Sequence, residues 1–342
     1  MFLGIDYATW WFLVVGGLFS GYAILDGFDL GAGALHLFLD KEESRRIALN
    51  AVGPVWDGNE VWLVIGGGAL FAGFPPVYAG LFSIMYIPFM LFLGFLIFRA
   101  VSIEFRSKEP MAWWRRMWDT TYCISSGMLG FLLGVVLGNV LQGIAIGPDY
   151  AFEGSWLDFL TPYPILVGIT SLALFMMHGA LYLSMKTEGR LFAKIVLILR
   201  RLTTFFIATF VLTTAYTLLF IPHLSDSLLD SWWIALVPAA IFAAIIAIPV
   251  QVRKHRYLPA FLLSASVLAM LLMLVAIELY PVIIRSTVAP EYSMTVFNSS
   301  ASEKSLGIVL TMAAIGTPLV LSYTAFVFWT FRGKVTLDEM SY

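Results

Sequence analysis

The sequence predicts an all-α, polytopic membrane protein with nine transmembrane helices. Of the 342 residues, 60% are hydrophobic and only 12% are charged, whereas a typical soluble domain is about 25% charged. This composition excludes a soluble enzyme, a disordered chain and a nucleic-acid-binding protein. A membrane β-barrel is also excluded, because its strands alternate in polarity and its lumen face is polar.

Nine apolar stretches are each long enough, or nearly long enough, to cross a hydrocarbon core of about 30 Å. They lie at residues 9–36, 56–74, 77–98, 118–142, 163–185, 202–221, 232–252, 258–281 and 306–331. Pro75-Pro76 is predicted to form a tight turn between the second and third spans, since proline cannot continue a helix. The loops are short, so residues 1–342 are expected to form a single transmembrane domain.

The connecting loops alternate strictly between a basic class and an acidic or neutral class. Of the 20 lysines and arginines, 18 fall on one side, with Arg99 and Arg106 assigned to a basic loop, and only Arg285 and Lys304 fall on the other. The positive-inside rule makes the basic side cytoplasmic. We therefore expect the N-terminus outside and the C-terminus in the cytoplasm.

Two of the spans need carboxylates to complete the crossing. The apolar run from residue 10 to 25 covers only about 24 Å, so the first helix must continue through Asp26 and Asp29, which share one face. The run from 62 to 74 covers about 20 Å, so Asp57 and Glu60 complete the second span. Asp119 opens the fourth span, and all five carboxylates enter from the basic side.

These carboxylates have two interpretations. A carboxylate inside a membrane helix costs about 2.5–3.5 kcal/mol on insertion scales, which makes it a candidate for function. Asp57 and Asp119 lie in N-terminal helical turns, where the helix dipole favours a negative charge, so capping explains Asp119 as well as function does. Asp26 and Asp29 lie toward the C-terminal half of their helix, where the dipole does not help. A chain of carboxyls that passes protons inward suits them better.

The sequence offers little for a metal or cofactor. Cys123 is the only cysteine, so a disulfide within the chain and a cysteine metal cluster are excluded, and no metal site is predicted. His178 is the only histidine well inside a span and could ligate a haem. A hydrogen-bonded interior histidine, or one that contacts a cofactor held by a partner, is the favoured interpretation.

Two motifs carry a family resemblance. Residues 26–33 (DGFDLGAG) and 56–62 (WDGNEVW) resemble the first-helix and second-helix signatures of subunit II of cytochrome bd-type quinol oxidases. Supporting matches, in chain order, are FRSK at 105–108, WD at 118–119, GNVLQG at 138–143 and KTEG at 186–189. The final third of the chain agrees in topology alone.

The resemblance implies a haem-free subunit, without a complete active site of its own, in a bacterial or archaeal cell membrane. Its partner is a haem-bearing subunit I that holds two b-type haems and one d-type haem, and a small accessory subunit and a quinone site in this chain stay open. The complex oxidises quinol, reduces dioxygen to water and generates proton motive force. Relatives offer carboxylates for a cytoplasmic proton route, a role carried over to Asp26, Asp29 and Asp57; the motif varies at Glu60.

Two other classes of protein stay open from the residues alone. Buried carboxylates and glycine-interrupted helices would also suit a proton-coupled secondary transporter, although the acidic motifs do not repeat in the second half of the chain. A cytochrome in its own right would use His178 as an axial ligand. The mass and the absorption spectrum of the purified particle separate these alternatives.

Overall fold

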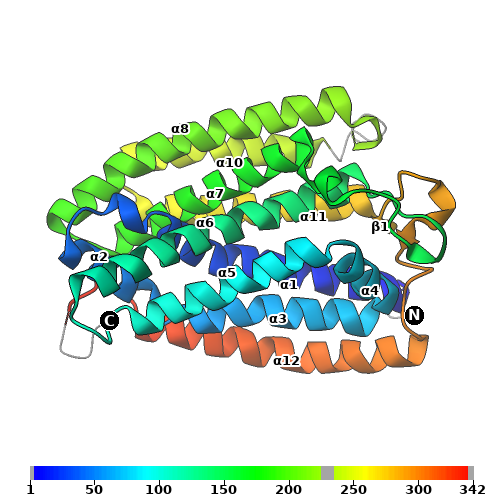
Figure 1. Ribbon diagram of the computed structural model, residues 1–342, viewed down its shortest axis with the longest axis horizontal. Coiled ribbons are helices and arrows are strands. Elements are labelled where there is room, and N and C mark those ends of the chain that lie inside the picture. The colour runs from blue at the N-terminus through cyan, green and yellow to red at the C-terminus, as the bar shows by residue number, and fades with distance from the viewer. Residues whose placement is uncertain (1–3, 225–234, 338–342) are drawn as a thin grey trace.

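The computed structural model describes residues 4–224 and 235–337 as a bundle of long helices lying side by side (Figure 1). The long helices are α1 (Tyr7–Ala34), α3 (Trp56–Gly73), α5 (Tyr86–Phe105), α6 (Ala112–Gln142), α7 (Pro162–Lys186), α8 (Gly189–Phe220), α10 (Leu236–Arg253), α11 (Tyr257–Leu279) and α12 (Glu303–Thr330). Two shorter helices are α2 (Glu42–Val52) and α4 (Pro75–Ile84).

The predicted fold class is confirmed. Within the described ranges, eight helices are long and apolar enough to cross a membrane, and the bent pair of α3 and α4 makes a ninth candidate. The predicted span 232–252 begins outside the described residues, and its described part is α10. Helix α1 begins at one end of the bundle and α12 finishes at the other (Figure 1), as an odd number of crossings requires.

The predicted boundary between the second and third spans is wrong. Pro75 and Pro76 do not form a tight turn; they occupy the first turn of α4, which is bent by 119° from α3. Proline suits that position because the first helical N–H groups need no partner within the helix. Phe74 and Met85, which flank α4, are both fully buried, so the two ends of this short helix are packed inside the protein. The third span is therefore α5, which runs on to Phe105 and carries Arg99 inside the helix.

The first basic loop contains a helix that the sequence analysis did not predict. Helix α2 has 11 residues, which cover only about 16 Å, too short to cross the bilayer. One face of it is buried through residues such as Leu49 and Val52, whereas Glu42 and Glu43 lie in its first turn. It therefore covers the basic end of the bundle.

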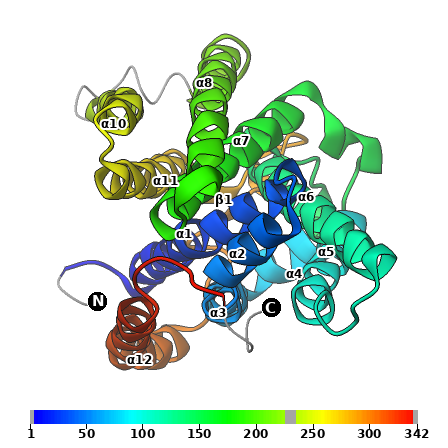
Figure 2. The ribbon, with the colours of Figure 1, turned by 90° about the vertical axis from the view of Figure 1, so that its left-hand side faces the viewer.

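Helix α1 lies near the centre of the bundle in the view along its length (Figure 2). A Cβ atom on Gly31 would lie 1.7 Å from the carbonyl oxygen of Phe175, and one on Gly179 would lie 2.3 Å from the backbone nitrogen of Ala32. Helices α1 and α7 thus pack backbone against backbone, as small residues allow. This contact fixes the position of the α1 turn that carries Asp29.

The other end of the bundle is closed by loops. Strand β1 (Val282–Ile284) pairs antiparallel with β2 (Met294–Thr295). The loop after α6 joins them, because the Ile144 N–H donates to the Arg285 carbonyl over 2.9 Å. The two-stranded sheet is a minor addition to the all-α fold.

Candidate functional site: two buried ionic clusters

An arginine and an aspartate form a fully buried ion pair in the bundle. The Arg99 Nη2 atom of α5 lies 2.5 Å from Asp26 Oδ1 of α1, and Nη1 lies 3.2 Å from Asp26 Oδ2. Both side chains are 0% exposed. A two-point contact between guanidinium and carboxylate is among the strongest polar contacts in proteins, so this pair holds α1 against α5.

Glu60 connects this pair to the outside of the chain. Its Oε2 atom accepts from the same Arg99 Nη1 atom at 3.1 Å, and its side chain is 21% exposed. Glu60 comes from α3, so three helices meet at one guanidinium. Asp26 and Glu60 are therefore an interior carboxyl and a peripheral carboxyl that share one cation.

Asp29 lies one turn further along α1 and is fully buried. Its Oδ2 atom accepts from Asn59 Nδ2 at 2.7 Å, and the same amide lies 3.2 Å from the Leu25 carbonyl. Its Oδ1 atom has no hydrogen-bond partner among the residues that the structure describes. Asp29 also lies within electrostatic range of Asp26, Arg99 and Glu60. We call Asp26, Asp29, Glu60 and Arg99 the Arg99 cluster.

The Arg99 cluster contains three carboxyl groups and one guanidinium. Arginine stays protonated in proteins, so the carboxyls alone can exchange protons. With one positive charge for three carboxyls, the cluster is electrically neutral only when it binds two protons. Proton exchange on the carboxyls is therefore the chemistry that these groups are able to perform.

Asp57 takes a different position. It lies on α3 one turn before Glu60, on the side of the basic end, and it is exposed. Residues three apart on a helix share a face, so Asp57 and Glu60 follow one another along α3. The structure therefore places Asp57 outside the buried part of the Arg99 cluster, between Glu60 and the basic end.

Asp119 belongs to a separate cluster two turns inside α6. The helix begins at Ala112 with no acidic residue in its first turn, so the expected helix-capping position of Asp119 is wrong. Its Oδ1 atom lies 2.5 Å from Arg106 Nε and 2.6 Å from His36 Nε2, and its Oδ2 atom lies 3.1 Å from Arg45 Nη1. Arg106 also reaches Glu42 Oε2 at 3.0 Å. We call Asp119 and these four partners the Asp119 cluster. Both oxygens of Asp119 are engaged by donors, which is the arrangement of a structural anchor.

Helix α1 ends at Ala34, two residues before the predicted end of the first span, so His36 lies outside it in a short 3-10 turn, where it is buried. Burial lowers the pKa of His36 below its usual value, because a charged imidazole would lose its hydration; the hydrogen bond to Asp119 opposes this effect. The ring also packs edge-on against Tyr122 with centroids 5.1 Å apart. His36 and Tyr122 therefore cover the side of the Asp119 cluster that faces the end of α1.

The assignment of Arg99 to a basic loop is wrong, whereas Arg106 does lie in the connection after α5 but is buried. Arg99 lies within α5 and Arg106 directly follows it, and among the described residues they are the largest of the fully buried side chains. The sequence did contain a signal, because carboxylates inside a membrane protein need cationic partners. Because carboxylates were predicted inside the spans, cationic side chains should have been expected inside the bundle as their partners.

His178 is hydrogen-bonded on both sides of its ring. Its Nδ1 atom lies 2.6 Å from Ser264 Oγ, and its Nε2 atom lies 3.1 Å from the Ile24 carbonyl. The ring stacks on Phe261 with centroids 4.5 Å apart. Neither ring nitrogen is available to an iron atom, so this residue does not fit a haem ligand and has the geometry of an interior packing histidine.

The fold and the clusters define a multi-pass helical membrane protein with protonatable groups buried between its helices. Residues 7–331 match the family model of cytochrome bd terminal oxidase subunit II. The chain belongs to this family.

Proteins similar to this chain cover almost all of it. Cytochrome bd-I ubiquinol oxidase subunit 2 of Escherichia coli K12 is 32% identical over 377 residues, with 98% of each chain covered. Cytochrome bd ubiquinol oxidase subunit 2 of Bacillus subtilis is 32% identical over 332 residues, with 96% of this chain and 97% of the relative covered. The bd oxidase structure from Geobacillus thermodenitrificans shares the fold, with a TM-score of 0.79, 18% identity and coverage of 95% and 98%.

Proposed function

We propose that this chain is the haem-free subunit II of a membrane quinol oxidase that reduces dioxygen to water. Its relatives are named as second subunits of ubiquinol oxidases, which supports quinol as the substrate and a haem-bearing subunit I as the partner. A proton-coupled transporter is the disfavoured alternative, since family membership now supports an oxidase.

The chain would stabilise subunit I through helix surface that its own fold leaves exposed. Leu306 is the only buried residue of α12, and α12 lies at the edge of the bundle (Figure 2). A helix with so few internal contacts depends on lipid or on a partner subunit for its packing. This feature supports a role of α12 in assembly.

The second part of the proposal is a proton-uptake route through the Arg99 cluster. The observation that carries it is the sharing of Arg99 by Asp26 and Glu60, one fully buried and one partly exposed. A proton that reaches Glu60, with Asp57 before it, can pass to Asp26 and Asp29 while Arg99 stabilises whichever carboxylate is left ionised. Asp119, with both oxygens engaged, is proposed as an anchor outside this route.

Proton uptake from one side of the membrane would give this route a role in energy conservation. Dioxygen reduction consumes protons, and the route opens toward the basic end, which we propose to be cytoplasmic. Protons taken from that side separate charge across the membrane even without a pump. The chain would therefore contribute to proton motive force through its carboxyls.

The test uses the assembled oxidase with Asp26→Asn, which removes a titratable group while keeping nearly the same shape. Asp149→Asn is the matched control, because Asp149 is exposed at the other end and has a backbone φ of 55° that asparagine tolerates. We expect both variants to keep their haem content, because Glu60 still pairs with Arg99 in Asp26→Asn and the amide still accepts a hydrogen bond. Only Asp26→Asn should slow proton uptake in a single turnover. Unchanged uptake in Asp26→Asn would exclude an obligatory route through this residue.

A further inference from the structure

A groove on the surface of α5 and α6 is not used by the proposed proton route. It has a volume of about 740 Å³ and its lining includes Phe95, Phe98, Trp113, Arg116, Thr121 and Ile124. Small-molecule sites in proteins commonly have about 300–1,000 Å³. The groove is therefore large enough for part of a lipid molecule.

The length and polarity of the groove suit an acyl chain. Its α6 wall runs from Ala112 to Ser125, about 20 Å along a helix and thus somewhat more than one leaflet of a hydrocarbon core of about 30 Å. Thr120 and Thr121 donate their hydroxyls to the carbonyls of Arg116 and Met117 within α6, at 2.9 and 3.0 Å. These hydroxyls are satisfied by their own helix, so the wall offers mainly apolar contact.

The basic end of the groove carries a positive charge. Arg116 is exposed, and the described part of the chain gives it no ion-pair partner, whereas neighbouring Arg115 reaches Glu42 over 3.5 Å. A guanidinium fits a phosphate group with two parallel hydrogen bonds. Trp113, 60% exposed, stands beside it as interfacial tryptophans do.

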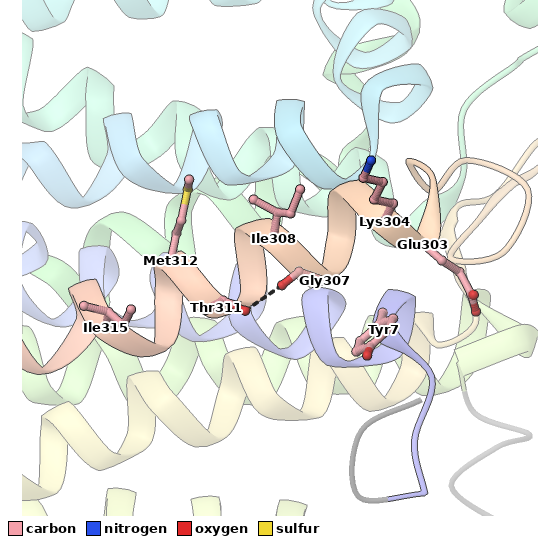
Figure 3. A pocket seen from close by; sticks show the side chains of 8 residues that line it. All are labelled: Tyr7, Glu303, Lys304, Gly307, Ile308, Thr311, Met312 and Ile315. Carbon is pink, nitrogen blue, oxygen red and sulfur yellow. Dashed lines mark hydrogen bonds between the residues drawn. The ribbon is translucent and has the colours of Figure 1, made fainter.

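A second groove provides a contrast. It lies between Tyr7 and α12 at the other end of the bundle, with a volume of about 670 Å³ (Figure 3). Its lining includes one residue of each sign, Glu303 and Lys304, so it has no net charge to select an anion. The α5–α6 groove is the one that combines an apolar wall with an unbalanced arginine.

We propose that the α5–α6 groove binds an anionic membrane phospholipid. One acyl chain lies along Phe95, Phe98 and Ile124, and the phosphate binds Arg116. The charge of Arg116 argues for this occupant, because an anionic lipid carries a net negative charge that complements its guanidinium and a neutral lipid does not. The site does not depend on the proton-uptake route.

The test counts lipids bound to the purified, delipidated oxidase by native mass spectrometry. Phosphatidylglycerol and phosphatidylcholine with the same acyl chains are added back separately. The variants are Arg116→Gln, which removes the charge, and Ile124→Trp, which fills the apolar groove while keeping the charge. Arg201→Gln, at an exposed arginine of α8, is the matched control.

We expect the parent complex to bind one phosphatidylglycerol about tenfold more tightly than phosphatidylcholine, the effect of one charge-assisted contact. Arg116→Gln should abolish this preference, Ile124→Trp should abolish binding of that lipid, and Arg201→Gln should behave as the parent. Equal binding of the two lipids by the parent would overturn the proposal. So would unchanged binding in either groove variant, an equal loss in Arg201→Gln, or a groove covered by the partner subunit.

Discussion

The Arg99 cluster and the Asp119 cluster contain similar groups in opposite proportions. The Arg99 cluster has one cation for three carboxyls, and one oxygen of Asp29 lacks a protein donor among the described residues. In the Asp119 cluster, two arginines and a histidine converge on one carboxylate. An excess of carboxyls leaves room for exchangeable protons, whereas an excess of donors holds a carboxylate ionised and fixed. The ratio of charges, more than burial, separates a candidate relay from an anchor.

The largest expected effect comes from Arg99→Leu. This change leaves Asp26 buried without its cation, and breaking a buried pair in this way typically costs about 3–5 kcal/mol. We expect a lower thermal midpoint and poor assembly of the oxidase, measured by haem recovered per cell mass. Adding Asp26→Asn to Arg99→Leu should restore part of the assembly, because the uncompensated charge is gone. Arg190→Leu, at an exposed arginine of α8, is the control. No rescue by the double variant would show that Arg99 acts mainly through other groups.

Asp119→Asn should affect stability and spare activity. The amide keeps part of the hydrogen bonding but loses the charge that Arg106, Arg45 and His36 share, and hydrogen bonds to charged groups contribute about 1.5–3 kcal/mol each. We expect a lower thermal midpoint with unchanged turnover and proton uptake per haem. Slow proton uptake in the assembled variant would move Asp119 from the anchors to the relay.

The comparison also shows what the sequence could and could not predict. Apolar run lengths placed Asp26, Asp29 and Glu60 inside the bundle, because a span that is too short must recruit the adjoining carboxylates. The same run-length argument put Arg99 in a loop, since the bend before α5 shifts that span toward the basic end. The convergence of Arg45 and Arg106 on Asp119 depends on tertiary contacts between segments up to 74 residues apart. The hydrophobic pattern of the sequence contains no information about such contacts.

Glu60→Gln tests the open side of the Arg99 cluster. Glu60 is the partly exposed member, so its loss should slow proton entry while assembly stays intact. We expect single-turnover proton uptake to fall about tenfold, equivalent to roughly 1.4 kcal/mol on the barrier. Asp57→Asn should give a smaller fall, because exposed Asp57 can be replaced by water as a proton donor. A larger effect in Asp57→Asn than in Glu60→Gln would reverse the proposed order of entry.

The smallest expected effect is a pH dependence of stability from His36. The pKa of His36 is lowered in the folded protein by burial, with Asp119 opposing and Arg106 and Arg45 adding to the decrease. The unfolded chain then binds the proton more readily than the folded one, so the free energy of unfolding rises with pH. Stability should be fully present above the ordinary histidine pKa of about 6.5 and should decline as pH falls below it toward the lowered folded value. Thermal midpoints of the assembled oxidase at pH 5 and pH 7.5 measure this decline, and His36→Gln, which cannot be protonated, should make it shallower. An unchanged difference between the two pH values in His36→Gln would assign the decline to carboxylates elsewhere, and the Asp119 cluster would then be a pH-independent anchor.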